Sequence, residues 1–79
     1  MRKHLIHAVK DRSVQDSYWE TPGAAYKAFL FWRERGYSVD WADLTAPTAE
    51  GQRVVAYTEN GKIMWNRQDL MRKMILAKI

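Results

Sequence analysis

Alternating apolar and polar positions predict strands along much of the chain. His4 to Lys10 alternates imperfectly, which predicts a strand with both faces partly covered. The polar segment Asp11-Arg12-Ser13 is turn-like. Val14 to Glu20 predicts a returning strand, since it holds valine, tyrosine and tryptophan, which favour extended backbone. Tyr37 to Trp41 shows the cleanest alternation and predicts a half-buried strand.

A helix is predicted from Pro22 to Arg35. Thr21 can cap it, because its hydroxyl accepts a hydrogen bond from a free N–H of the first turn. Proline suits the first helical position, and Gly36 can adopt the left-handed conformation that ends a helix. The apolar face repeats at helical spacing through Ala25, Ala28, Phe29 and Trp32.

Asn60-Gly61 predicts a tight hairpin between the strands Arg53 to Glu59 and Lys62 to Trp65. Both residues tolerate positive φ, which a two-residue turn requires. This turn predicts four pairs: Glu59 with Lys62, Thr58 with Ile63, Tyr57 with Met64, and Ala56 with Trp65. The expected core face carries Val54, Ala56, Thr58, Ile63 and Trp65, and the expected outer face carries Arg53, Val55, Tyr57, Glu59, Lys62 and Met64.

A loop is predicted from Thr45 to Gly51, and a second helix from about Arg67 to Lys78. Asn66 can cap this helix, with Asp69 three residues on. Its apolar face is expected to hold Leu70, Met71, Met74 and Ile75. The order strand, strand, helix, strand, strand, strand, helix predicts an α+β fold, a small antiparallel sheet with two helices packed on one face. The 79 residues allow one domain, residues 1–79.

Composition narrows the classes of function. The chain has no cysteine, which excludes disulfides and a Cys-based zinc site. It has no apolar run of the roughly 20 residues that span a membrane, and its start lacks the pattern of a signal peptide, so we expect a cytoplasmic protein. A net charge of +4 suits nucleic acid, an acidic protein surface or an ordinary soluble domain.

No pattern for catalysis is evident. The two histidines, His4 and His7, point to opposite faces of a strand and cannot easily share a metal ion. The glycines are dispersed, and no serine lies in a nucleophile motif. We therefore expect a protein that is not an enzyme and that uses no cofactor and no metal.

Surplus apolar surface suggests a contact function. Phe31 lies to one side of the first helix's apolar stripe, close to Arg35, and aromatic residues beside arginine are typical of interface anchors. Small proteins also expose some apolar atoms without any function. The candidate partner-binding residues are Phe31, Arg35, Arg53, Tyr57, Lys62, Met64, Arg72 and Lys73.

Three partners fit these features. Another protein or a ribonucleoprotein complex would use the aromatic and methionine surface. Nucleic acid could bind basic residues interleaved with aromatic ones, as in single-strand binders. A second copy of the chain could cover the spare apolar face in a homodimer.

The segment Ala56-Tyr57-Thr58-Glu59-Asn60-Gly61-Lys62-Ile63-Met64-Trp65 resembles the closing hairpin of some small phage-encoded anti-CRISPR proteins. The likeness covers about ten residues, and the additional helix at the end of the chain departs from that family's layout. The resemblance implies an inhibitor that binds a CRISPR surveillance complex in the host cytoplasm and blocks DNA recognition.

Overall fold

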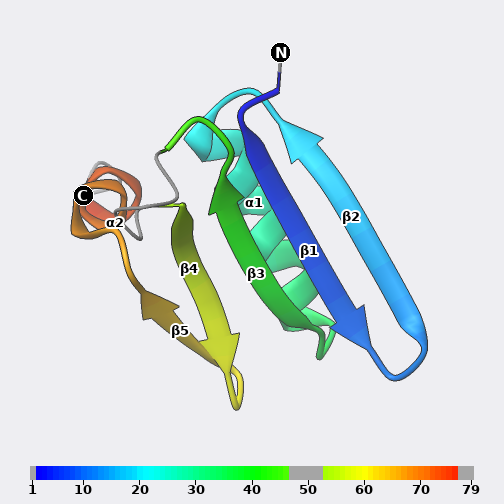
Figure 1. Ribbon diagram of the computed structural model, residues 1–79. Coiled ribbons are helices and arrows are strands. Elements are labelled where there is room, and N and C mark those ends of the chain that lie inside the picture. The colour runs from blue at the N-terminus through cyan, green and yellow to red at the C-terminus, as the bar shows by residue number, and fades with distance from the viewer. Residues whose placement is uncertain (1, 47–52, 77–79) are drawn as a thin grey trace.

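Five strands of the described chain form one antiparallel sheet, in the order β2-β1-β3-β4-β5 (Figure 1). The computed structural model describes residues 2–46 and 53–76. The elements along the chain are β1 (His4–Lys10), β2 (Ser13–Trp19), α1 (Pro22–Glu34), β3 (Ser38–Asp43), β4 (Val54–Glu59), β5 (Lys62–Trp65) and α2 (Gln68–Leu76). This confirms the predicted α+β fold and element order; Pro47 to Gly51 of the predicted loop and Lys78 lie outside the described residues.

The core lies between the sheet and α1, which runs along one face of the sheet (Figure 1). Trp41 and Phe29 are the largest fully buried side chains, and their ring centroids lie 6.1 Å apart. α2 lies beside β4 and adds Leu70 to the same core. The other core residues are Ile6, Ala8, Ala25, Ala28, Val39, Val55 and Ala56.

Local signals set the ends of α1 as predicted. The side chain of Thr21 accepts a hydrogen bond from the N–H of Ala24 at 3.2 Å, and Pro22 occupies the first turn. Gly36 follows the helix with φ of +84°. The helix therefore starts and stops where its capping residues allow.

The β4–β5 hairpin has the predicted register. Glu59 pairs with Lys62, and the other three predicted pairs are also present: Thr58 with Ile63, Tyr57 with Met64, and Ala56 with Trp65. Asn60 and Gly61 both have positive φ, at 51° and 80°. The two-residue turn thus determines which residues of the two strands face each other.

Two predicted assignments in β4 are wrong: Val54, expected in the core, is outward, and Val55, expected on the outer face, is buried. Val54 is 44% exposed, whereas Val55 is 0% exposed. The cause is a β-bulge, because Trp41 pairs with Ala56 but Ala42 pairs with Val54, which leaves Val55 as an extra residue. A bulge turns two successive side chains toward one face, so Val55 joins Ala56 in the core.

α2 begins where backbone and side-chain contacts join its first turn to the sheet. The N–H groups of Asn66 and Arg67 both donate to the carbonyl of Val55, at 2.9 and 3.0 Å. Arg67 also reaches Asp43 of β3, with Nη1 3.1 Å from Oδ2. Of the predicted apolar face Leu70 is buried and Met74 packs against the core, but Ile75 is 43% exposed.

Candidate functional site: a groove between α1 and the edge strand

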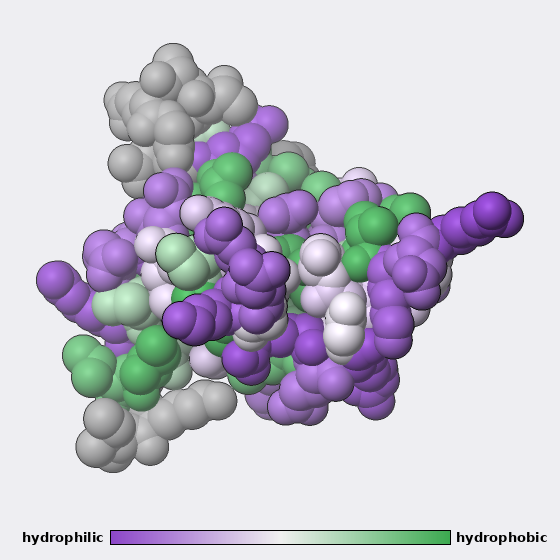
Figure 2. Space-filling view, turned by 90° about the horizontal axis from the view of Figure 1, so that it is seen from below, coloured by the Kyte–Doolittle hydropathy of each residue, from purple (hydrophilic) through white to green (hydrophobic). Residues whose placement is uncertain are grey.

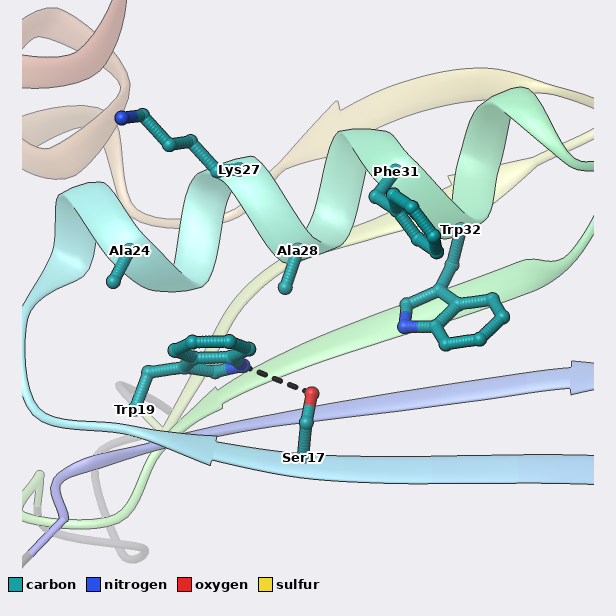
Figure 3. Close-up of a pocket in the computed structure, with 7 residues that line it drawn as sticks. All are labelled: Ser17, Trp19, Ala24, Lys27, Ala28, Phe31 and Trp32. Carbon is teal, nitrogen blue, oxygen red and sulfur yellow. Dashed lines mark hydrogen bonds between the residues drawn. The ribbon is translucent and has the colours of Figure 1, made fainter.

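An apolar groove of about 450 Å³ lies between α1 and β2, which is an edge strand of the sheet (Figure 3). Trp19, at the end of β2, and Phe31 and Trp32, on α1, provide its aromatic walls. Ala24, Ala28, Ser17 and Lys27 complete the lining.

Small side chains on both elements create this groove. Ala24 and Ala28 are four residues apart on α1, and both point toward β2 (Figure 3). On β2, Ser17 pairs with the buried Ile6 and so faces the helix side of the sheet. A serine facing two alanines leaves space that larger core side chains would otherwise fill.

The aromatic walls are held in place by contacts with one another and with neighbouring side chains. The Arg35 guanidinium lies 3.4 Å from the centroid of the Phe31 ring, and its Nη1 donates to the Phe31 carbonyl at 2.9 Å. The rings of Phe31 and Trp32 meet edge to face at 4.9 Å, as do those of Trp32 and Tyr37. The Trp19 Nε1–H donates to Ser17 Oγ at 2.9 Å. The groove is therefore preformed, and binding does not have to order its walls.

The groove continues toward the start of α1. A second hollow of about 380 Å³ shares Trp19 and Ala24 with the first. Arg2, Glu20, Tyr18 and Thr21 also line it. Together the two hollows lie along the end of β2 and the first part of α1, with Arg2 and Glu20 at their border, while the Lys27 ammonium group points away from Trp19 (Figure 3).

The open face of the sheet, opposite α1, is the other apolar surface. Ile6 and Ala8 of β1 face the helix, so Leu5, His7 and Val9 face outward. The strand pairings place five exposed large apolar side chains on this face: Val14, Tyr18, Val54, Tyr57 and Met64. One row across it carries Asp16, His7 and Asp40, with Asp16 Oδ1 2.5 Å from His7 Nδ1.

The eight predicted partner-binding residues divide among separate surfaces. Phe31, which is 44% exposed, and Arg35 stack together at the groove. Tyr57, Met64 and Lys62 lie on the open sheet face, where Tyr57 pairs with Met64. The other three predicted residues are also exposed: Arg53 lies just before β4, and Arg72 and Lys73 lie on α2.

Hydrophilic side chains cover much of the end of the molecule that carries the β1–β2 and β4–β5 turns (Figure 2). Lys10 Nζ donates to the Arg35 carbonyl at 2.9 Å, and Arg33 Nε donates to the Gly61 carbonyl at 2.8 Å. These bonds bring the last turn of α1 to both sheet turns. The basic side chains of this end are Lys10, Arg12, Arg33, Arg35 and Lys62, and its acidic ones are Asp11, Glu34 and Glu59.

His4, at the start of β1, and Asp43, at the end of β3, have displaced pKa values; both lie at the end of the sheet opposite the β1–β2 turn. Burial lowers the pKa of His4, whose Nδ1 accepts a hydrogen bond from Trp41 Nε1–H at 3.1 Å. Burial by itself would raise the pKa of Asp43, but hydrogen bonds from Thr45 and Arg67 keep it below its ordinary value. These contacts join β1, β3 and the start of α2, which is a structural use of the cluster.

Sequence reasoning identified Phe31 and Arg35 but missed the other groove residues: Ser17, Trp19, Ala24, Lys27, Ala28 and Trp32. Ala24, Ala28 and Phe31 stand at i, i+4 and i+7, which marks a second helix stripe with small residues. This stripe is the feature of the sequence that could have predicted a groove. The small residues form one only because β2 lies beside them, and the position of β2 is known only from the fold.

No group of three or more histidine, cysteine, aspartate or glutamate side chains is placed to hold a metal ion within residues 2–46 and 53–76. Neither helix of that part of the chain is long and apolar enough to cross a membrane. No protein-family model, curated protein or solved structure matches this chain.

Proposed function

We propose that this chain is a non-enzymatic protein-binding module whose binding site is the groove between α1 and β2. The observation that carries the proposal is a preformed apolar hollow with walls of Trp19, Phe31 and Trp32 beside an unpartnered sheet edge. Tryptophan and arginine are enriched among residues that dominate binding energy, and Arg35 lies directly on Phe31. Such a site recognises a partner by shape and apolar contact.

The partner class follows from the surfaces available. The groove is almost wholly apolar, which suits a protein side chain better than a phosphate backbone. The open sheet face, where a single-strand binder would stack bases, carries the three carboxylates of Asp16, Asp40 and Glu59 against one lysine, Lys62. These carboxylates would repel a nucleic acid.

The hairpin resemblance suggests one specific partner, a CRISPR surveillance complex, and the inhibition of that complex is the corresponding activity. The hairpin residues Tyr57, Lys62 and Met64 face away from α1. They would form a second contact on a large partner that also occupies the groove. This assignment is a proposal that rests on the resemblance.

The proposal is tested by affinity capture from nuclease-treated lysate of the cells in which the chain is naturally expressed. Wild type is compared with Phe31→Ala at the groove and with Ile75→Ala, which alters an exposed apolar side chain on α2. We expect a protein that wild type and Ile75→Ala retain and that Phe31→Ala binds with an affinity at least about tenfold lower. Capture that disappears with nuclease, or that ignores Phe31→Ala, would contradict the proposal.

Nucleic-acid binding is the second candidate, and the basic end of the molecule favours it. Lys10, Arg12, Arg33, Arg35 and Lys62 come together there from three segments. This function predicts affinity for single-stranded DNA or RNA that falls steeply with salt. A titration at low salt without any complex would exclude it.

A further inference from the structure

We infer that the groove receives an extended segment of a partner polypeptide, which adds to β2 as a sixth strand and places one large apolar side chain between Trp19 and Phe31. The inference rests on the proposed function and specifies its binding mode. β2 pairs only with β1 among the described strands, and on its backbone Arg2 Nη1 donates to the Tyr18 carbonyl at 3.0 Å, a bond that an added strand would replace. An edge strand presents N–H and C=O groups that pair readily with another chain.

The side chains around this edge fit a strand. In an added strand, alternate side chains point to the helix side of the sheet. There they would meet Ser17, Ala24 and Ala28, which are small, and then the aromatic walls. The remaining side chains would lie beside Val14 and Tyr18, which are exposed on the open face. A single strand could thus contact both apolar surfaces of the molecule.

The charges along the rim indicate what selects the segment. Lys27 borders the main hollow, Arg2 borders the second, and Arg35 covers Phe31 from outside. Glu20 borders the second hollow, Asp16 lies on β2 itself, and the Lys27 ammonium group points away from Trp19 (Figure 3). Basic and acidic groups are therefore nearly balanced along this edge, and we infer that backbone pairing and apolar contact select the segment.

The occupant is an extended peptide and not a helix, because a helix satisfies its own backbone groups and would leave the edge of β2 unused. β2 has seven residues, which sets the length of segment that can pair along it. The strand pairs of the described sheet are antiparallel, so antiparallel addition continues the existing pattern.

The test uses synthetic peptides of seven residues, the length of β2. The probe alternates threonine and valine, with a central phenylalanine and an aspartate at each end. Two matched peptides carry N-methyl groups on alternate backbone amides, one set on the odd positions and the other on the even ones. Only one set can face β2, so strand addition requires one methylated peptide to bind and the other to lose at least about tenfold in affinity.

The second readout is amide hydrogen exchange of the full chain. We expect the parent peptide to slow exchange at alternate residues of β2, and Ala24→Phe, which fills the groove, to abolish this protection. Ala42→Phe, on the open face of β3, is the control that keeps it. Binding without protection of β2, equal affinity of the two methylated peptides, or no binding at the solubility limit would overturn strand addition. Loss of partner capture in Phe31→Ala would still support the protein-binding function in each of these cases.

Discussion

The indole N–H of Trp41 donates a hydrogen bond to Nδ1 of His4 across 3.1 Å inside the core. Nδ1 must therefore be an acceptor, so His4 is neutral and carries its proton on Nε2. His4 is only 5% exposed, so water has little access to it. Protonation of Nδ1 would remove the acceptor and place a charge in a buried position, which Asp43 favours and Arg67 opposes.

Acid should destabilise the protein through His4. Burial lowers its pKa in the folded chain below 6.5, whereas the unfolded chain titrates near 6.5. As pH falls below that value the unfolded state binds a proton first, so the free energy of unfolding decreases. The decrease is up to about 1.4 kcal/mol per pH unit within this window. Urea denaturation at about pH 7 and about pH 5 measures it.

His4→Asn is the matched variant for this experiment. Asparagine can still accept from Trp41 but does not titrate. We expect its stability to change less than that of wild type between the two pH values. Equal pH dependence in the two proteins would show that His4 is not the responsible group.

The hairpin turn should resist side chains at Gly61. Its φ of +80° is costly for a residue with a Cβ, while nothing lies within 4 Å of a Cβ added there. Gly61→Ala should therefore cost about 1–2 kcal/mol from backbone conformation, without any clash. Gly23→Ala, in the first turn of α1, also meets open space and should leave stability unchanged or raise it by up to about 1 kcal/mol. Equal effects of the two variants on chemical denaturation would contradict this reasoning.

The β-bulge predicts opposite outcomes for two neighbouring valines. Val55→Ala removes fully buried methyl groups and should lower the free energy of unfolding by about 1.5 kcal/mol or more. Val54→Ala alters an outward side chain and should cost less than about 0.5 kcal/mol. Thermal or urea unfolding of the pair provides the comparison, and a larger cost at Val54 would refute the bulged arrangement.

Sequence reasoning succeeded where the signal was local. The caps of α1 and the turn at Asn60-Gly61 depend on a few adjacent residues, and both were predicted correctly. The bulge at Val55 was not predictable in the same way. It depends on pairing with Trp41 and on N–H groups from the start of α2, which are distant in sequence.

The groove was also not predictable from the sequence, because it depends on residues that are distant along the chain. Phe31 could be recognised as surplus to the helix stripe, but Ser17 and Trp19 gained a role only when β2 paired with β1 beneath the alanines of α1. A small residue in a sequence does not reveal whether the space beside it is filled. The candidate contact residues were therefore assigned to one set, although the fold divides them among the groove, the open sheet face and α2.

The most direct test of the groove as the binding site is the dissociation constant of the captured partner for wild type, Ala24→Phe and Ala42→Phe, measured by calorimetry. Both substitutions add the same side chain at a half-buried alanine, one inside the groove and one on the open face of the sheet. The account predicts that Ala24→Phe weakens binding at least about tenfold and that Ala42→Phe leaves it within about twofold. Equal affinity of Ala24→Phe and wild type, or loss of binding only in Ala42→Phe, would contradict it.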